Sequence, residues 1–174
     1  GRVMVFDLGG GTFDISIAKV IGKKIDIMTS VGDKHLGGQD FDREIIKILD
    51  KKYKKSKGKG LDHEDPVVLD IAERIKKLLS TKEKVSEIIE GPKGPLKIDI
   101  SRKEFENSID TFLEKIKMSM EDALDRAKIK ANNISQILLV GGSTRIPVIT
   151  EIIKKVMKKN PTKGVNVDEA VACG

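Results

Sequence analysis

Residues 3–17 read Val3-Met4-Val5-Phe6-Asp7-Leu8-Gly9-Gly10-Gly11-Thr12-Phe13-Asp14-Ile15-Ser16-Ile17. An apolar run leads into an acid, three consecutive glycines follow, and polar and apolar residues then alternate. This pattern predicts a strand, a tight turn and a second strand that carries Thr12, Asp14 and Ser16 on one face. Consecutive glycines permit positive φ and leave the backbone N–H groups open to a ligand. The stretch therefore predicts a hairpin whose turn can hold an anion such as a phosphate.

Two acids, Asp7 and Asp14, bracket the turn formed by Gly9, Gly10 and Gly11. A phosphate bound at the turn would lie beside both carboxylates, and like charges require a cation between them. Mg²⁺ binds in proteins through one or two carboxylates, retained waters and phosphate oxygens. The turn therefore indicates a metal–nucleotide site. An ordinary hairpin, whose glycines serve only turn geometry, is the alternative that the glycines alone leave open.

The size and composition of the chain suit one globular domain. Its 174 residues are enough for a substantial core, and hydrophobic residues make up 39% and charged residues 34%. No apolar run approaches the length of about 20 residues that spans a bilayer. The single cysteine, Cys173, excludes an intrachain disulfide framework and fits a reducing compartment. We expect a cytoplasmic protein, and an organelle matrix also fits.

The net charge of +6 is concentrated in a lysine cluster. The cluster surrounds Tyr53 and consists of Lys51, Lys52, Lys54, Lys55, Lys57 and Lys59. Such a cluster is compatible with a nucleic-acid or acidic-membrane surface. We favour a solvated helix end, because cations interact favourably with a helix C-terminus and no nucleic-acid module is recognisable. No nucleic-acid partner and no membrane partner are therefore predicted.

Periodicity and turn residues predict the remaining elements. A helix is expected from Pro66, which follows the capping acid Asp65, and another from a capping box at Ser101 nearly to Lys130. The expected strands are residues 3–8, 12–21, 24–31, 83–90, 96–100 and 137–140. The expected helices begin near residues 40, 66, 101 and 145, and Asn166 and Asp168 cap a last one. Residues 32–38 are expected to form a second glycine-bearing loop.

This order of elements predicts one α/β domain. The first three strands have short turns and are expected to form an antiparallel meander within a mixed sheet flanked by helices. The strand at 137–140 is fully apolar, which is typical of a strand buried on both faces. We assign residues 1–38 and 116–174 to a sheet subdomain, and residues 39–115 to a small helix and hairpin insert.

A second glycine pair, in Gly141-Gly142-Ser143, lies where the strand at 137–140 meets the following helix. Free backbone N–H groups and the positive end of a helix dipole favour an anion or a polar ring at such a position. The alternative is a plain turn in which Ser143 or Thr144 caps the helix.

The helix after Pro66 carries a polar stripe of Glu73, Lys76, Lys77 and Ser80. At about 100° per residue these four side chains share one face, and together they could bind ribose hydroxyls and a purine edge. A solvated face with a local ion pair is the alternative. The histidines at 35 and 63 have no second ligand at metal-binding spacing.

Four strings in this sequence resemble the heat-shock protein 70 (DnaK-like) chaperone family, part of the actin and sugar-kinase ATPase superfamily. Residues 7–14, Asp-Leu-Gly-Gly-Gly-Thr-Phe-Asp, are similar to that family's second phosphate-binding loop. Residues 32–42 resemble its adenosine-contacting loop and residues 141–147 its adenine-binding turn. Residues 168–172 resemble the start of the helix that returns to the other lobe. The resemblance implies the second lobe of an actin-like (ribonuclease H-like) ATPase domain.

The resemblance also implies roles for individual residues. Catalytic roles would fall to Asp7, Thr12 and Asp14, with Asp7 holding Mg²⁺ through water and Asp14 binding a metal or the attacking water. The residues implied in nucleotide binding are Gly9, Gly10, Gly11, Thr12, Gly37, Gly38, Gln39, Glu73, Lys76, Lys77, Ser80, Gly141, Gly142, Ser143, Arg145, Ile146 and Asp168. Within this set Gly10, Gly11 and Thr12 would contact the β- and γ-phosphates. The ribose would lie on Gly38, Glu73 and Lys76. The adenine would be framed by Ser80, Gly142, Ser143, Arg145 and Ile146, with Asp168 at the hinge side of the cleft.

The implied ligands are ATP or ADP with Mg²⁺, and K⁺ is a further candidate ion. The implied partners of the full protein are unfolded peptide clients, a J-domain co-chaperone and a nucleotide-exchange factor. Three residues depart from the family's pattern: Gln39 replaces a glutamate, Lys77 an arginine and Val167 a proline. An ammonium cannot stack on adenine as a guanidinium does, so these changes bear on nucleotide affinity more than on the fold.

In this family the ATPase cleft lies between two lobes. We therefore expect a first lobe to precede Gly1, a substrate-binding domain to follow Gly174, and the chain alone to have little ATPase activity. One alternative is a sugar or glycerol kinase lobe, against which residues 36–42 argue. The other is a non-hydrolysing chaperone relative used as an exchange or docking module, which is consistent with Gln39 and Lys77.

Overall fold

The computed structural model describes residues 1–162. The chain divides into two compact units. Unit 1 is built from Gly1–Gly38 and the chain from Thr111 onward, and unit 2 from Gln39–Asp110. Strands and helices occur in both, and the predicted α/β class with a mixed sheet is confirmed.

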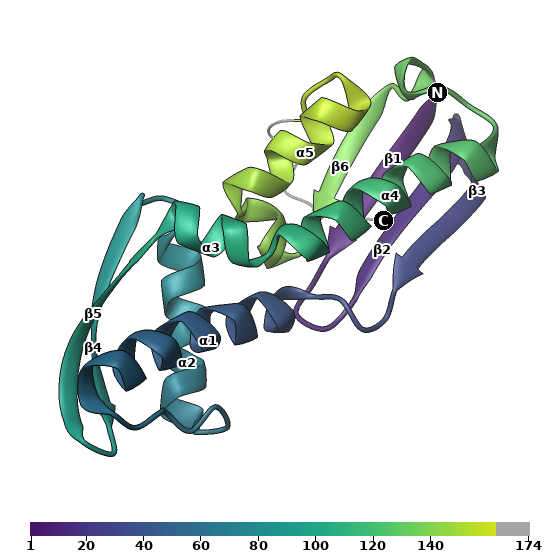
Figure 1. The fold of residues 1–174 in the computed structure, drawn as a ribbon. Coiled ribbons are helices and arrows are strands. Elements are labelled where there is room, and N and C mark those ends of the chain that lie inside the picture. Colours follow the sequence, from purple (N-terminus) through teal and green to yellow (C-terminus); the bar gives the residue numbers. More distant parts are fainter. Residues whose placement is uncertain (163–174) are drawn as a thin grey trace. The chain divides into compact units, whose positions relative to one another are not determined.

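Unit 1 contains a four-stranded sheet (Figure 1). Its strands are β1 (Arg2–Leu8), β2 (Phe13–Ile21), β3 (Lys24–Asp33) and β6 (Gln136–Val140). Their order across the sheet is β3-β2-β1-β6. The first three pair antiparallel, which confirms the predicted meander, and β6 runs parallel to β1.

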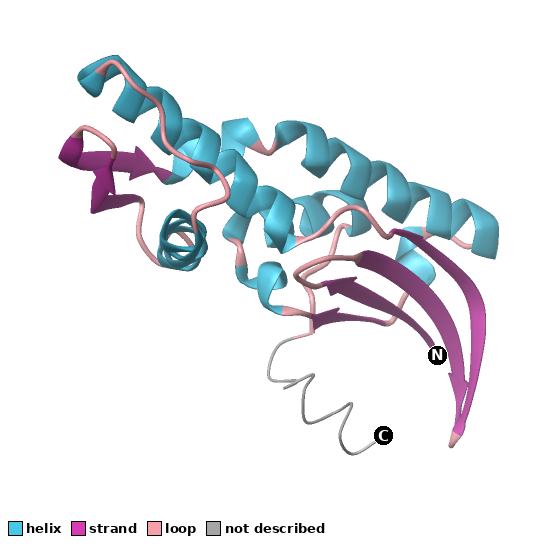
Figure 2. Cartoon of the chain, turned by 90° about the horizontal axis from the view of Figure 1, so that it is seen from below, coloured by secondary structure: helices cyan, strands magenta, loops and turns pink. Residues whose placement is uncertain are grey.

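Helices cover one face of this sheet. Helix α4 (Asp110–Ala127) lies across the strands (Figures 1 and 2), and α5 (Pro147–Met157) lies beside β6. Two short 3₁₀ helices, η1 (Ala131–Asn133) and η2 (Gly142–Arg145), flank β6. Every second residue is buried from Met4 to Leu8 of β1 and from Phe13 to Ile17 of β2, as the period-two alternation requires. Asp7 on β1 and Asp14 on β2 alternate with these buried residues and are only half-buried.

Unit 2 is a hairpin packed with three helices. Its elements are α1 (Gly38–Lys57), α2 (Pro66–Leu78), β4 (Lys84–Gly91), β5 (Gly94–Ser101) and α3 (Arg102–Ser108). The predicted caps form, because Asp65 accepts a hydrogen bond from the N–H of Val67 and Ser101 and Glu104 make a capping box.

Tyr53 ties α1 to the turn of the β4–β5 hairpin. Its side chain is fully buried, and its hydroxyl donates to the Gly94 carbonyl at 2.8 Å and accepts from the Lys93 N–H at 2.9 Å. A Cβ on Gly91 would overlap the tyrosine ring. The tyrosine ring therefore packs directly against the backbone, and its hydroxyl has hydrogen-bond partners.

Two predicted elements differ from the structure. The long helix expected from Ser101 nearly to Lys130 is wrong: it is two helices, α3 and α4, separated at Ile109 with φ −100° and ψ 9°. The Ser108 hydroxyl donates to the Phe105 carbonyl at 2.6 Å, a side-chain bond that competes with the helix ladder. The helix expected from Arg145 starts at Pro147, because the 3₁₀ turn η2 precedes it.

The expected burial of β6 on both faces is also wrong. Ile137 is fully buried, whereas Leu138, Leu139 and Val140 are half-buried among the described residues. Strand β3 continues to Asp33, two residues into the expected loop. The helix start expected at Asn166 and Asp168 lies outside the described residues. None of the helices in residues 1–162 is long and apolar enough to cross a membrane.

Candidate functional site

Two glycine-bearing segments of unit 1 touch at the β1–β2 turn. The Gly9 N–H donates to the Thr12 carbonyl at 3.1 Å and closes the hairpin. The Gly38 N–H donates to the Gly9 carbonyl at 2.8 Å, and a Cβ on Gly37 would lie 2.7 Å from the Gly10 carbonyl oxygen. The turn and the loop before α1 are therefore in backbone contact, which only glycine at residue 37 allows.

A third glycine segment, after β6, reaches the same end of β1. Gly141 has φ +93°, and a Cβ there would overlap the Leu8 carbonyl and lie 3.1 Å from the Gly9 nitrogen. The parallel pairing of β6 with β1 ends at Asp7 and Val140, which carries the Gly141 turn to this position. Three segments that are distant in the sequence thus meet where β1 ends.

Three other glycines at this junction are required neither by their backbone dihedral angles nor by close packing. Gly10, Gly11 and Gly142 all have negative φ, and a Cβ on any of them would meet no atom of residues 1–162 within 4 Å. The ordinary-hairpin alternative explains such glycines by positive φ or crowding, and neither holds here. Open space before exposed backbone is the arrangement that a closely approaching anion requires.

The two acids that bracket the turn are direct neighbours across β1 and β2. Asp7 pairs with Asp14 in the antiparallel register. Burial raises the pKa of Asp7 above its ordinary value of 3.8, and the charge of Asp14 raises it further. A cation between the carboxylates would relieve this repulsion. Within residues 1–162 no cluster of three or more metal-ligating side chains occurs, so water and phosphate would have to complete the coordination of Mg²⁺.

Asp14 is held by Ser16, which was predicted to share its face, and by residues of β3 that sequence reasoning missed. Its carboxylate accepts hydrogen bonds from Ser16 at 3.1 Å and from Ser30 at 2.9 Å. Gly32 lies opposite Asp14 on β3, and a Cβ there would come within 3.1 Å of Asp14 Oδ1. The β2–β3 register places Ser30 and Gly32 beside this carboxylate, and only that register could have identified them.

The turn after β6 carries the residues predicted for adenine. Ser143 and Ile146 are buried, while Gly142 and Arg145 are exposed. The alternative of a cap by Ser143 or Thr144 does not hold: the Thr144 hydroxyl donates back to the Gly141 carbonyl at 2.6 Å, and no side chain within residues 1–162 caps α5. The positive end of this helix is therefore left to its backbone N–H groups.

The members of the polar stripe predicted on α2 differ in exposure. Lys76 is buried, with its Nζ 2.9 Å from Asp42 Oδ1, whereas the exposed Lys77 pairs with Glu73 at 3.1 Å. Ser80 lies beyond the helix, which ends at Leu78. The burial of Lys76 rules out for this residue the alternative of a solvated face, and it is compatible with the packing of lysine stems on apolar surface.

The Asp42–Lys76 ion pair is close and largely shielded from solvent, with 2.9 Å between Lys76 Nζ and Asp42 Oδ1. Burial raises the pKa of Asp42 above 3.8, against the opposing effect of Lys76. The structure therefore engages Lys76 with a carboxylate of its own unit.

The predicted site residues are divided between the two units. The phosphate and adenine segments and Gly37 and Gly38 belong to unit 1. The exposed Gln39 and the α2 residues at 73, 76, 77 and 80 belong to unit 2. Asp168 lies outside the described residues. The three glycine-bearing segments of unit 1 meet in the structure. Of the α2 residues, Glu73, Lys76 and Lys77 make ion pairs within unit 2.

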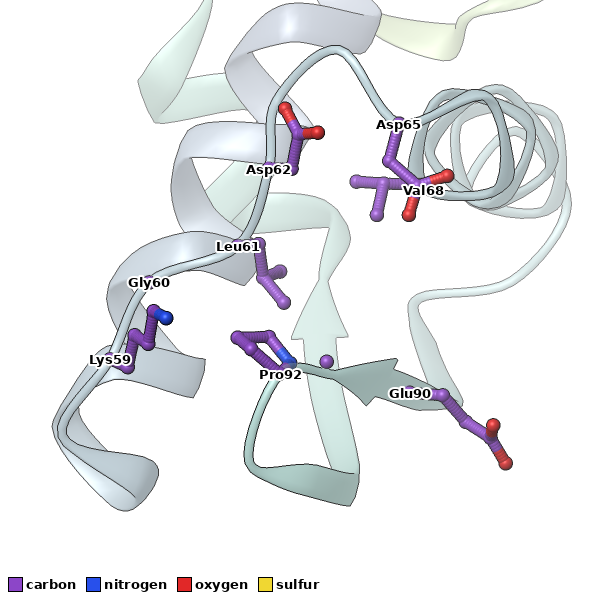
Figure 3. Close-up of a pocket in the computed structure, with 9 residues that line it drawn as sticks. Lys59, Gly60, Leu61, Asp62, Asp65, Val68, Glu90 and Pro92 are labelled. Atoms are coloured by element: carbon purple, nitrogen blue, oxygen red, sulfur yellow. The ribbon is translucent and has the colours of Figure 1, made fainter.

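Unit 2 also contains a pocket of about 530 Å³ that includes none of the predicted residues (Figure 3). It is lined by residues 59–62, Asp65, Val68 and residues 90–92. The side chains of Leu61, Val68 and Pro92 converge on it, and Glu90 points away. Asp65 already caps α2, so this pocket offers no set of groups suited to a nucleotide.

Comparison with known proteins agrees with these observations. The sequence matches the family model described as Hsp70 protein over residues 1–174. It is 40% identical over 183 residues to the chaperone protein DnaK of Thermosipho africanus (strain TCF52B). That alignment covers 99% of this chain and 30% of the relative, so the chain spans less than a third of the relative's length.

Proposed function

The chain belongs to the Hsp70 family, and on that premise we propose that it forms the second lobe of the ATP-binding domain of a chaperone. The observation that carries the proposal is the junction at the end of β1. There the Gly9–Gly11 turn, the loop at residues 37–38 and the turn after β6 meet beside two carboxylates. Mg²⁺ and a nucleotide phosphate would supply the cation and the anion that this arrangement lacks by itself.

In this proposal each part of the junction has a task. The backbone N–H groups of Gly10, Gly11 and Thr12 hold the β- and γ-phosphates, and Asp7 holds Mg²⁺ through water. Asp14, fixed by two serine hydroxyls, orients the attacking water or a second ion, for which K⁺ is a candidate. Phosphoryl transfer needs positioning and charge neutralisation more than covalent chemistry, and these groups provide both.

Within unit 1 the nucleoside would lie against the turn after β6. Gly142, Ser143, Arg145 and Ile146 frame the adenine, and its ring lies on open backbone at Gly142. Ser80 completes the adenine contacts, and Gly38, Glu73 and Lys76 hold the ribose. For ribose binding Lys76 would have to share its charge with Asp42.

In the whole protein, ATP hydrolysis would drive binding and release of unfolded peptides in the cytoplasm. A J-domain co-chaperone and a nucleotide-exchange factor would regulate this cycle. The chain alone would have little ATPase activity, because the opposite lobe of the cleft supplies the remaining charge. ATP turnover by the chain at rates close to those of a two-lobe domain would contradict this.

One observation favours a second candidate, a non-hydrolysing relative that serves as an exchange or docking module. Two lysines expected to meet the nucleoside are paired with carboxylates of the protein, Lys77 with Glu73 and Lys76 with Asp42. Calorimetric titration of Mg·ATP into a polypeptide that also carries the residues encoded before Gly1 separates the two candidates. Binding with later release of phosphate supports the ATPase, and absence of binding supports the second candidate.

The variant Gly10→Ala tests the junction itself. Since a Cβ at this position meets nothing within 4 Å, the free energy of unfolding should change by less than about 0.5 kcal/mol. The methyl group would nevertheless occupy the space of the phosphate, so the affinity for Mg·ATP should fall by about tenfold or more. Ser56→Ala, on the exposed surface of α1, is the matched control and should change neither quantity. Unchanged affinity in Gly10→Ala would show that the phosphate does not bind at this turn.

A further inference from the structure

A groove of about 530 Å³ lies within unit 2 between α1 and α3. Three lysines of α1, Lys51, Lys52 and Lys55, line it together with Ile48, and α3 contributes Glu104 and Ser108. These lysines belong to the cluster that sequence analysis interpreted as a solvated helix end. The helix dipole accounts for lysines in the last turn of α1, such as Lys55, but Lys51 precedes that turn.

The one acid of the groove is already neutralised. Lys52 lies 2.7 Å from Glu104 Oε2 and donates a further hydrogen bond to the Asp99 carbonyl at 2.6 Å. Burial raises the pKa of Glu104, but the bonds from Lys52 and Ser101 outweigh it and hold that pKa below 4.5, so the carboxylate stays ionised. Lys52 and Glu104 thus form a closed pair.

Two positive charges remain unbalanced beside this pair. Lys51 and Lys55 are exposed and lie one helical turn apart, on the same side of α1. Neither makes a salt bridge to any carboxylate in residues 1–162. Their methylene stems and Ile48 give the groove an apolar floor between the charges.

This combination favours an acidic polypeptide over a nucleic acid. Single-stranded nucleic acids bind through aromatic side chains on which bases stack, together with basic residues. The tyrosine among these lysines, Tyr53, is fully buried against the β4–β5 turn, and no aromatic side chain lines the groove. Carboxylates flanking an apolar side chain match both the spacing of the lysines and the apolar floor.

We infer that the α1–α3 groove binds an acidic amphipathic segment of a partner protein. Carboxylates of that segment pair with Lys51 and Lys55, and an apolar side chain between them packs on Ile48. This docking surface includes no residue assigned to the nucleotide. The inference is therefore independent of the proposed ATPase function.

Fluorescence anisotropy with a labelled peptide of glutamates and regularly spaced leucines tests this inference on the whole chain. The double variant Lys51→Gln/Lys55→Gln should weaken binding about five- to twentyfold, since an exposed ion pair contributes at most about 1 kcal/mol. The control Lys154→Gln/Lys155→Gln removes the same charge from the exposed surface of α5 and should change the affinity less than about twofold.

Two further probes complete the experiment. A peptide with serines in place of leucines should bind several-fold more weakly if the apolar floor takes part. A single-stranded oligonucleotide of equal charge should bind more weakly than the leucine peptide. Equal loss in both lysine variants would overturn the inference in favour of non-specific attraction. Tighter binding of the oligonucleotide would overturn it in favour of a nucleic acid.

Discussion

Replacement of Asp7 by Asn should stabilise the fold while it weakens nucleotide binding. Asp7 and Asp14 are cross-strand neighbours, and like charges directly opposite each other destabilise a sheet. The raised pKa of Asp7, caused first by burial and then by Asp14, shows that the folded protein disfavours the ionised form of this carboxylate. The asparagine side chain has nearly the same shape and no charge, so the substitution removes the free-energy cost of ionising the carboxylate.

The expected gain follows from the register. A cross-strand pair of this kind contributes roughly 0.2–1 kcal/mol, so Asp7→Asn should raise the free energy of unfolding by about 0.5 kcal/mol. For a chain of this length that corresponds to an increase in Tm of about 1–2 °C. The pKa of Asp7 is raised on folding, so the destabilisation is present above the raised pKa and absent below the ordinary value of 3.8. The gain should therefore be largest near neutral pH and vanish as the pH falls toward 3.8.

Thermal unfolding followed by circular dichroism at several pH values measures this gain, and calorimetry with Mg·ADP measures the loss of affinity. Asp14→Asn makes the same change of charge one strand away and is the matched control. Asp14 accepts hydrogen bonds from two serines, so its replacement should not stabilise the protein. Two results would refute the reasoning: a lower Tm for Asp7→Asn at neutral pH, or equal stabilisation by both variants.

Three other substitutions test the packing that supports the site. Gly37→Ala places a methyl group 2.7 Å from backbone of the β1–β2 turn and should destabilise the protein by about 1–3 kcal/mol in urea unfolding, unlike a substitution at the open Gly10. Tyr53→Phe leaves the Gly94 carbonyl without its donor and should cost about 1–3 kcal/mol; a change below about 0.5 kcal/mol would show that water replaces the hydroxyl. Asp42→Asn removes the carboxylate that lies 2.9 Å from the buried Lys76 ammonium and should cost about 3 kcal/mol, whereas replacement of both partners by apolar residues should recover most of that loss.

The sequence was sufficient for the elements whose signals are local. The meander of β1, β2 and β3 was predicted from period-two alternation and turn residues, and the structure confirms it. The caps at Asp65 and Ser101 form as predicted, because a cap depends on residues only a few positions apart. The fold class followed from these elements together with the resemblance, and it is confirmed.

The sequence was insufficient to predict side-chain interactions whose partner is the backbone or lies on another helix or strand. The break at Ile109 was missed because the apolar spacing continues through it, while the Ser108 hydroxyl bonds to the backbone instead. The burial of Lys76 against Asp42 joins residues from two different helices, so no pattern within one helix could reveal it. The roles of Ser30 and Gly32 at Asp14 depend on the register between two strands.

For the candidate site, the sequence identified the glycine turns but not the reason for each glycine. Gly37 and Gly141 are required by close backbone packing, whereas Gly10 and Gly142 face open space. The four residues are alike in sequence, and only the surrounding atoms separate the packing glycines from those left for a ligand. The assignment of individual nucleotide contacts remains a prediction.

Paramagnetic broadening by Mn²⁺·ADP tests the central claim most directly, in a ¹⁵N-glycine-labelled polypeptide that also carries the residues encoded before Gly1. If the junction at the end of β1 holds the metal-bound phosphates, the amide signals of Gly10, Gly11 and Gly38 should broaden first. Gly22, in the β2–β3 turn at the opposite end of β2, should stay sharp. Broadening of the Gly22 signal, with Gly10 and Gly11 unaffected, would contradict the account.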